Sequence, residues 1–116
     1  MKKHLGCYPV DYRTWFQQLS QIVPREEMVY FLIDCGGDGY IGEKFRIFES
    51  YIPELIKILT LLNQTFWLDL GLPDYYLVSK KYKWIVGFNH HDVVSFAGEG
   101  LDIQAINALK SSTCNL

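Results

Sequence analysis

Three short segments in the second half of this 116-residue chain restrict its fold more than any other feature. Residues 75–79, 84–88 and 93–97 are rich in β-branched and aromatic side chains. The connections between them, residues 80–83 and 89–92, are short and polar. Runs of this composition with short polar connections are typical of β-hairpins. We therefore predict that the second half of the chain forms an antiparallel meander.

The first half of the chain alternates helical and extended patterns. Apolar residues recur at helical spacing over residues 12–23, where Asp11 is the expected cap and Pro24 the stop. Residues 28–33 form a continuous apolar run, which predicts an interior strand covered on both faces. A weaker strand pattern covers residues 45–49, and a helix follows with Ser50 as its expected cap. A further strand over residues 66–70 and a terminal helix capped by Asp102 complete the pattern.

These elements predict one α+β domain over residues 1–116, with an antiparallel or mixed sheet of four to five strands and two to three helices packed on it. Hydrophobic residues make up 49% of the chain, which is enough to build a core without disulfides or metal. Three cysteines, an odd number without a C-x-x-C pair, indicate a reducing compartment. Because the N-terminal apolar run is broken by Pro9 and Asp11, we expect no signal peptide, and we expect a cytoplasmic protein.

With a net charge of −2, the chain lacks the excess of basic residues that is typical of nucleic-acid-binding proteins. No run approaches the ~20 apolar residues that a membrane-spanning helix needs. We expect no direct contact with nucleic acid or membrane. We also expect no metal and no cofactor.

A glycine-rich segment over residues 34–42 resembles a calcium loop, with Asp34 and Asp38 at the first and fifth positions. The third position is Gly36 and the twelfth is Phe45, where an EF-hand requires a bidentate glutamate. A turn that leaves the carboxylates exposed is therefore the better interpretation. Exposed carboxylates suit contact with a basic partner.

The segment Asn89-His90-His91-Asp92 is the most distinctive polar cluster. His91 could act as a general base oriented by Asp92. Adjacent strand residues point to opposite faces, so the two histidines could share a metal only in a turn. The structural interpretation is a hairpin loop in which Asn89 and Asp92 bond the local backbone. No nucleophile or zinc spacing accompanies the cluster, and we assign no catalytic residue.

The run DYYLVSKKYKWIV over residues 74–86, followed by NHHD over residues 89–92, resembles small bacterial proteins. Many of these look like immunity proteins of contact-dependent inhibition and related polymorphic toxin systems. The similarity covers residues 74–100 and consists of strands and turns. It implies a cytoplasmic inhibitor that binds a toxin domain, often a nuclease.

We therefore expect an immunity-type protein that neutralises a basic, nuclease-type toxin domain by covering its active site. Two alternatives stay open: a small hydrolase or nuclease-like enzyme that uses His91 and Asp92, and a scaffold subunit that forms homo-oligomers through an apolar patch around Tyr75, Tyr76 and Tyr82. The expected partner-binding residues combine exposed carboxylates with aromatic anchors and the histidine loop. They are Asp34, Asp38, Tyr40, Glu43, Asp69, Asp74, Tyr75, His91 and Asp92.

Overall fold

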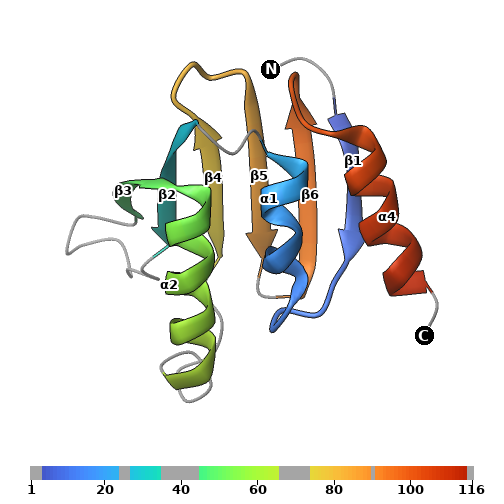
Figure 1. Cartoon of the computed structure of the whole chain (residues 1–116), viewed down its shortest axis with the longest axis horizontal. Helices are drawn as coiled ribbons and strands as arrows, with labels where there is room; N and C mark the ends of the chain where they lie inside the picture. The colour runs from blue at the N-terminus through green and yellow to red at the C-terminus, as the bar shows by residue number, and fades with distance from the viewer. Residues whose placement is uncertain (1–3, 24–26, 35–44, 66–73, 90, 115–116) are drawn as a thin grey trace.

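A computed structural model describes residues 4–23, 27–34, 45–65, 74–89 and 91–114 of the chain. These residues form one layer of helices on one β-sheet (Figure 1). The elements are β1 (His4–Pro9), the 3₁₀-helix η1 (Trp15–Gln18), α1 (Leu19–Ile22), β2 (Met28–Asp34), β3 (Phe45–Tyr51), α2 (Ile52–Thr65), β4 (Tyr75–Ser79), β5 (Trp84–Asn89), β6 (Val93–Gly98) and α4 (Ile103–Cys114).

Across the sheet the strands stand in the order β1-β6-β5-β4-β2-β3, and every neighbouring pair is antiparallel. The predicted meander is confirmed as β4, β5 and β6, each within one residue of its expected bounds. The α+β class is confirmed as well. The sheet of the described residues has six strands, whereas the sequence predicts four or five.

The strand that the sequence pattern does not indicate is β1, which pairs with β6 at one edge of the sheet. It contains Gly6 and ends at Pro9, two residue types that are depleted in strands. An edge strand tolerates both, because only one side of its backbone has to join the ladder. The register of β1 shifts between His4 and Gly6, as at a β-bulge.

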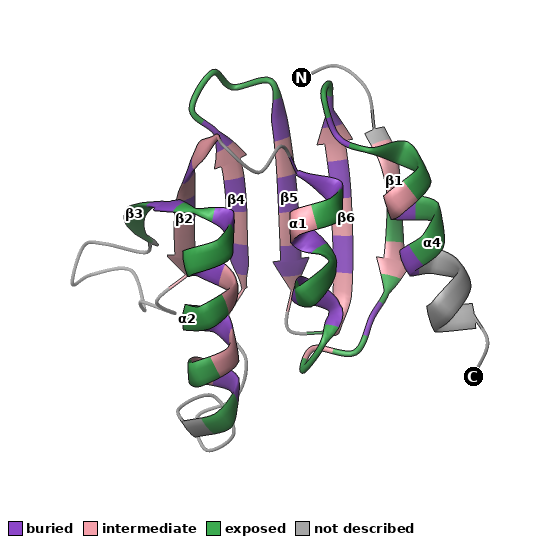
Figure 2. Cartoon of the chain, viewed as in Figure 1, coloured by how far each residue is buried: buried purple, intermediate pink, exposed green. Residues whose placement is uncertain are grey.

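The helices lie on one face of the sheet, and the core fills the space between the two layers (Figure 1). Burial alternates along the strands, so that every second residue faces the helices (Figure 2). Each fully buried aliphatic or aromatic side chain contributes about 1.5–3 kcal/mol to folding. The helices contribute Phe16, Leu19, Ile22, Leu55, Leu59 and Ile106, and the strands contribute Val29, Leu77, Val86, Val94 and Phe96.

The helix predicted over residues 12–23 is shorter in the structure. The carboxylate of Asp11 accepts a hydrogen bond from the backbone N–H of Arg13 at 2.9 Å, and its carbonyl accepts one from Trp15 at 3.0 Å. The side-chain bond to Arg13 closes a local turn at the start of the segment, whereas the bond from Trp15 has helical spacing. The chain therefore turns first, and α-helical geometry begins only at Leu19. The predicted apolar face is nevertheless buried.

The second helix begins at Ile52, because β3 extends to Tyr51. Ser50 is the expected cap, but it pairs with Val29 in the sheet, and its hydroxyl donates to the Tyr51 carbonyl at 3.1 Å. The cap of the last helix is confirmed, since the backbone N–H of Ala105 donates to Asp102 Oδ1 at 3.0 Å.

Candidate binding surface

The face of the sheet opposite the helices is covered by no described element (Figure 1). We call this surface the open face. Solvated faces of antiparallel sheets usually carry polar side chains. Here most side chains are apolar or aromatic and half-buried, which is typical of a binding surface. The open face comprises Cys7, Pro9, Met28, Tyr30, Leu32, Ile47, Glu49, Tyr51, Tyr76, Val78, Ile85, Gly87, Asn89, Val93, Ser95 and Ala97.

The apolar run of residues 28–33 explains why this face is apolar. The run forms β2, an interior strand as predicted, between β3 and β4. The prediction that both of its faces are covered is wrong. Val29 and Phe31 are buried under the helices, whereas Tyr30 and Leu32 are half-buried on the open face. An unbroken apolar run was thus the sequence signal for this surface.

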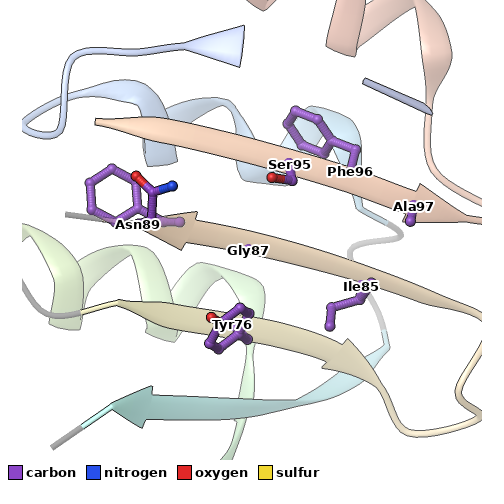
Figure 3. A pocket seen from close by; sticks show the side chains of 8 residues that line it. Tyr76, Ile85, Gly87, Asn89, Ser95, Phe96 and Ala97 are labelled. Atoms are coloured by element: carbon purple, nitrogen blue, oxygen red, sulfur yellow. The ribbon is translucent and has the colours of Figure 1, made fainter. Parts of the chain in front are cut away.

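A hollow of about 170 Å³ lies near the middle of the open face (Figure 3). Tyr76, Gly87 and Ser95 stand side by side on β4, β5 and β6. Gly87 leaves space for the ring of Tyr76, because a Cβ atom at Gly87 would lie 2.9 Å from Tyr76 Cδ1. Small side chains form the floor of the hollow, while Tyr76, Ile85 and Asn89 border it. The hollow can therefore receive an apolar side chain of a partner.

A second hollow of about 200 Å³ lies between β3 and the β4–β5 turn, and it is lined by Tyr30, Leu32, Ile47, Val78 and Tyr82. Tyr82 has a φ of 57°, which is uncommon for a bulky residue. Its backbone N–H donates to the Ser79 carbonyl at 2.8 Å and closes the turn. Its ring stacks on Tyr30 at 6.3 Å and is 66% exposed. The turn thereby presents an aromatic ring beside the open face.

The turn between β4 and β5 carries three lysines, Lys80, Lys81 and Lys83, and the first of them contacts this region. Lys80 Nζ lies 3.2 Å from Glu49 Oε2 and 5.7 Å from the ring centroid of Tyr30. This ion pair is exposed and contributes little to stability. Lys81 and Lys83 are also exposed. The structure therefore agrees with a solvated hairpin at this end of the sheet.

Carboxylates gather at the opposite end of the sheet. The backbone N–H of Asp34, at the end of β2, donates to the Asp74 carbonyl just before β4, at 2.9 Å. The turn with His91 and Asp92 follows β5 at the same end, because the strands are antiparallel. The fold thus places Asp34, Asp74, His91 and Asp92 at one end of the sheet, which we call the acidic end. These are four of the nine predicted partner-binding residues.

The sequence predicts that side chains of the Asn89–Asp92 turn bond the local backbone, and the structure shows this for Asn89. Asn89 Oδ1 accepts the His91 backbone N–H at 2.9 Å, and the Asn89 carbonyl accepts the Asp92 N–H at 3.1 Å. Asp92 has a φ of 61°, which aspartate tolerates better than most residues. The Asp92 carbonyl also accepts the Val10 N–H at 2.8 Å, which joins the turn to the end of β1.

Asp92 and His91 differ in their surroundings. Asp92 lines a hollow of about 660 Å³ together with residues of the 9–18 segment, and His91 is not among the lining residues. Asp92 Oδ1 is buried, and within the described part of the chain it accepts no hydrogen bond. Beside it, hydrogen bonds from Arg13 lower the pKa of Asp11.

Tyr75 is not an exposed anchor, and this expectation is wrong. Its side chain is 1% exposed on the helix-facing side of β4. The hydroxyl of Tyr75 accepts a hydrogen bond from Trp15 Nε1 at 3.1 Å, and its ring stacks on Phe88 at 4.9 Å. Burial raises the pKa of Tyr75 well above its ordinary value. The side chain of the next residue, Tyr76, borders the open face instead, because strand side chains alternate.

Asp38, Tyr40 and Glu43 of the glycine-rich segment, and Asp69, lie outside the described residues. The residues that the structure does describe include no group of three or more His, Cys, Asp or Glu positioned to hold a metal ion. None of the helices in the described ranges is long and apolar enough to cross a bilayer.

Comparisons with known proteins connect the whole fold to one family. Searches of curated proteins and of solved structures found no match to the chain. A model of a protein family of unknown function, DUF6756, matches residues 3–108, which include all six strands and half of α4. The chain therefore belongs to the DUF6756 family.

Proposed function

We propose that this chain is an immunity-type protein that binds a toxin domain and neutralises it by covering the toxin's active site. The observation that carries the proposal is an apolar sheet face that no described element covers, with carboxylates gathered at one end. Enzyme chemistry has weaker support, because Asp92 lines the hollow of about 660 Å³ and His91 does not.

The two parts of the surface would contribute differently to binding. Burial of Tyr76, Val78 and Ile85 supplies affinity, since apolar area removed from water is stabilising. Carboxylates such as Asp34 and Asp74 supply faster association and specificity toward a basic surface. Nuclease active sites carry lysine, arginine and histidine to hold phosphate, so they are the complementary partner.

The test begins with the toxin domain encoded beside the gene of this protein. Co-expression should restore the growth of cells that produce the toxin domain. Purified toxin domain should bind the protein, and association should be slower at roughly 300 mM than at 50 mM salt, because salt screens charge steering. A neighbouring toxin domain that is neither bound nor neutralised would overturn the proposal.

Two variants with matched controls locate the surface. Asp74→Lys should slow association, whereas Glu54→Lys changes the net charge equally on the helix side and should not. Ile85→Lys should speed dissociation, whereas Ile58→Lys on α2 should not. If both control variants lose protection and neither test variant does, the binding site lies on the helix layer and not on the open face.

A further inference from the structure

The two edges of the sheet are built differently. At one edge, β1 carries Gly6, Pro9 and a register shift, all of which hinder pairing with another strand. At the other edge, β3 runs for seven residues without glycine or proline. Its register with β2 is continuous from Phe45 to Tyr51. Only the β3 edge is therefore a regular template for another strand.

Large apolar side chains are exposed on both sides of β3. Ile47 is 63% exposed and Tyr51 is 44% exposed, and both lie on the open face. Phe48 is 50% exposed on the helix-facing side, where its ring lies 6.5 Å from that of Phe31. Within the described residues, their exposure shows that no other element covers these side chains. A regular, apolar edge strand of this kind is a pairing site.

We propose that β3 pairs antiparallel with β3 of a second copy of this chain, so that two sheets become one continuous sheet. The proposal does not rest on the toxin-binding function, because it uses the outer edge of β3 and not the centre of the open face. A two-fold axis perpendicular to the sheet keeps both helix layers on one side. Directly opposed residues then share a face.

The charges of β3 exclude two of the possible registers. An axis at Arg46 or at Glu49 would place like charges directly opposite each other, which is unfavourable. An axis at Ile47 places the two Ile47 side chains together and Arg46 against the partner's Phe48, an arrangement suited to a cation–π contact. An axis at Phe48 pairs the two Phe48 rings. A second copy of β3 can therefore satisfy both faces of this edge without opposing like charges.

Pairing at this edge would also enlarge the open face. Ile47 lines the hollow of about 200 Å³, so two such hollows would lie on either side of the axis. One strand pair buries less area than a standard interface of about 1,600 Å². We therefore expect a reversible dimer that forms with rising protein concentration.

The test is sedimentation velocity of the full chain over roughly 1–200 µM, a range that reveals weak self-association. The wild type should shift from monomer to dimer, and Ile47→Lys/Phe48→Lys should weaken association at least tenfold. The matched control is Ile58→Lys/Leu61→Lys on α2, where the side chains are 45% and 60% exposed. It adds the same charge and should leave the dimer intact. Unchanged circular dichroism and melting temperature would show that both variants are folded.

Three outcomes would overturn the proposal. The first is a wild type that stays monomeric at every concentration. The second is a dimer that persists in the Ile47→Lys/Phe48→Lys variant. The third is a dimer that Ile85→Lys on the open face abolishes while the edge variant does not. A second measurement replaces Ile47 or Phe48 singly with cysteine in a chain whose three native cysteines are serine. Oxidative cross-linking should join copies at position 47 or 48 and not at position 57 of α2. Equal cross-linking at all three positions would also overturn the proposal.

Discussion

Replacing Tyr75 with phenylalanine removes one buried hydroxyl group and leaves the ring in place. Trp15 is 2% exposed, and its indole N–H donates to that hydroxyl at 3.1 Å. In the variant this N–H loses its partner inside the core. An unsatisfied buried donor destabilises a protein by about 1–3 kcal/mol. For a domain of this size, 1 kcal/mol lowers the melting temperature by about 4–8 °C.

Urea denaturation of the Tyr75→Phe variant at pH 7 measures this effect. We expect the midpoint to fall while the slope of the unfolding free energy against urea stays unchanged, because the exposed surface hardly differs. Tyr82→Phe is the matched control, since the Tyr82 side chain is 66% exposed. That variant should stay within about 0.5 kcal/mol of the wild type.

The pH dependence provides an independent check. Burial raises the pKa of Tyr75 above its ordinary value of 10.0, although the hydrogen bond from Trp15 offsets part of the rise. A raised pKa in the folded state stabilises the fold below the unfolded pKa, and this stability is lost as the pH rises above about 10. The wild type should therefore lose about 1.4 kcal/mol per pH unit more than the variant in that range. A stability difference that is the same at pH 9 and pH 11, or no difference at pH 7, would refute a buried, hydrogen-bonded Tyr75 hydroxyl.

Three further substitutions test the fold by urea or thermal denaturation. Gly98→Ala should destabilise the protein by several kcal/mol, because Gly98 has a φ of 109° and a Cβ atom would collide with the backbone carbonyl of Lys83; stability near that of the wild type would contradict this geometry. Leu77→Ala should lower the unfolding free energy by about 2–5 kcal/mol, because the side chain is 0% exposed in the core. A loss below about 1 kcal/mol would place that side chain outside the core. Asp102→Ala should cost about 0.5–2 kcal/mol by removing the acceptor of the Ala105 N–H, and Asp102→Asn should recover most of it.

Local sequence patterns were sufficient to predict the elements whose structure depends only on their own residues. The meander of β4, β5 and β6 follows from β-forming runs with short polar connections, and both features are local. The capping role of Asp102 and the turn role of Asn89 are also local, because each side chain bonds backbone within three residues. The α+β class follows from the same patterns.

Elements that depend on a distant partner could not be predicted in this way. The first strand, with Gly6 and Pro9, is extended because β6 provides a ladder almost ninety residues later in the chain. The predicted helix cap at Ser50 failed for the same reason, since pairing with Val29 extends β3 beyond it. Tertiary pairing overrides weak local preference in both cases.

The candidate surface was decided by the tertiary structure as well. The sequence alone determined that residues 28–33 are apolar and extended, and that Tyr75 and Tyr76 point to opposite faces of a strand. Only the assembled sheet decided that one of those faces is covered by helices and the other is not. Strand order then brought Asp34, Asp74 and the histidine turn to one end. Burial and neighbourhood are properties of the whole packing, so no local pattern could indicate that Tyr75 lies inside the core while Tyr76 borders the open face.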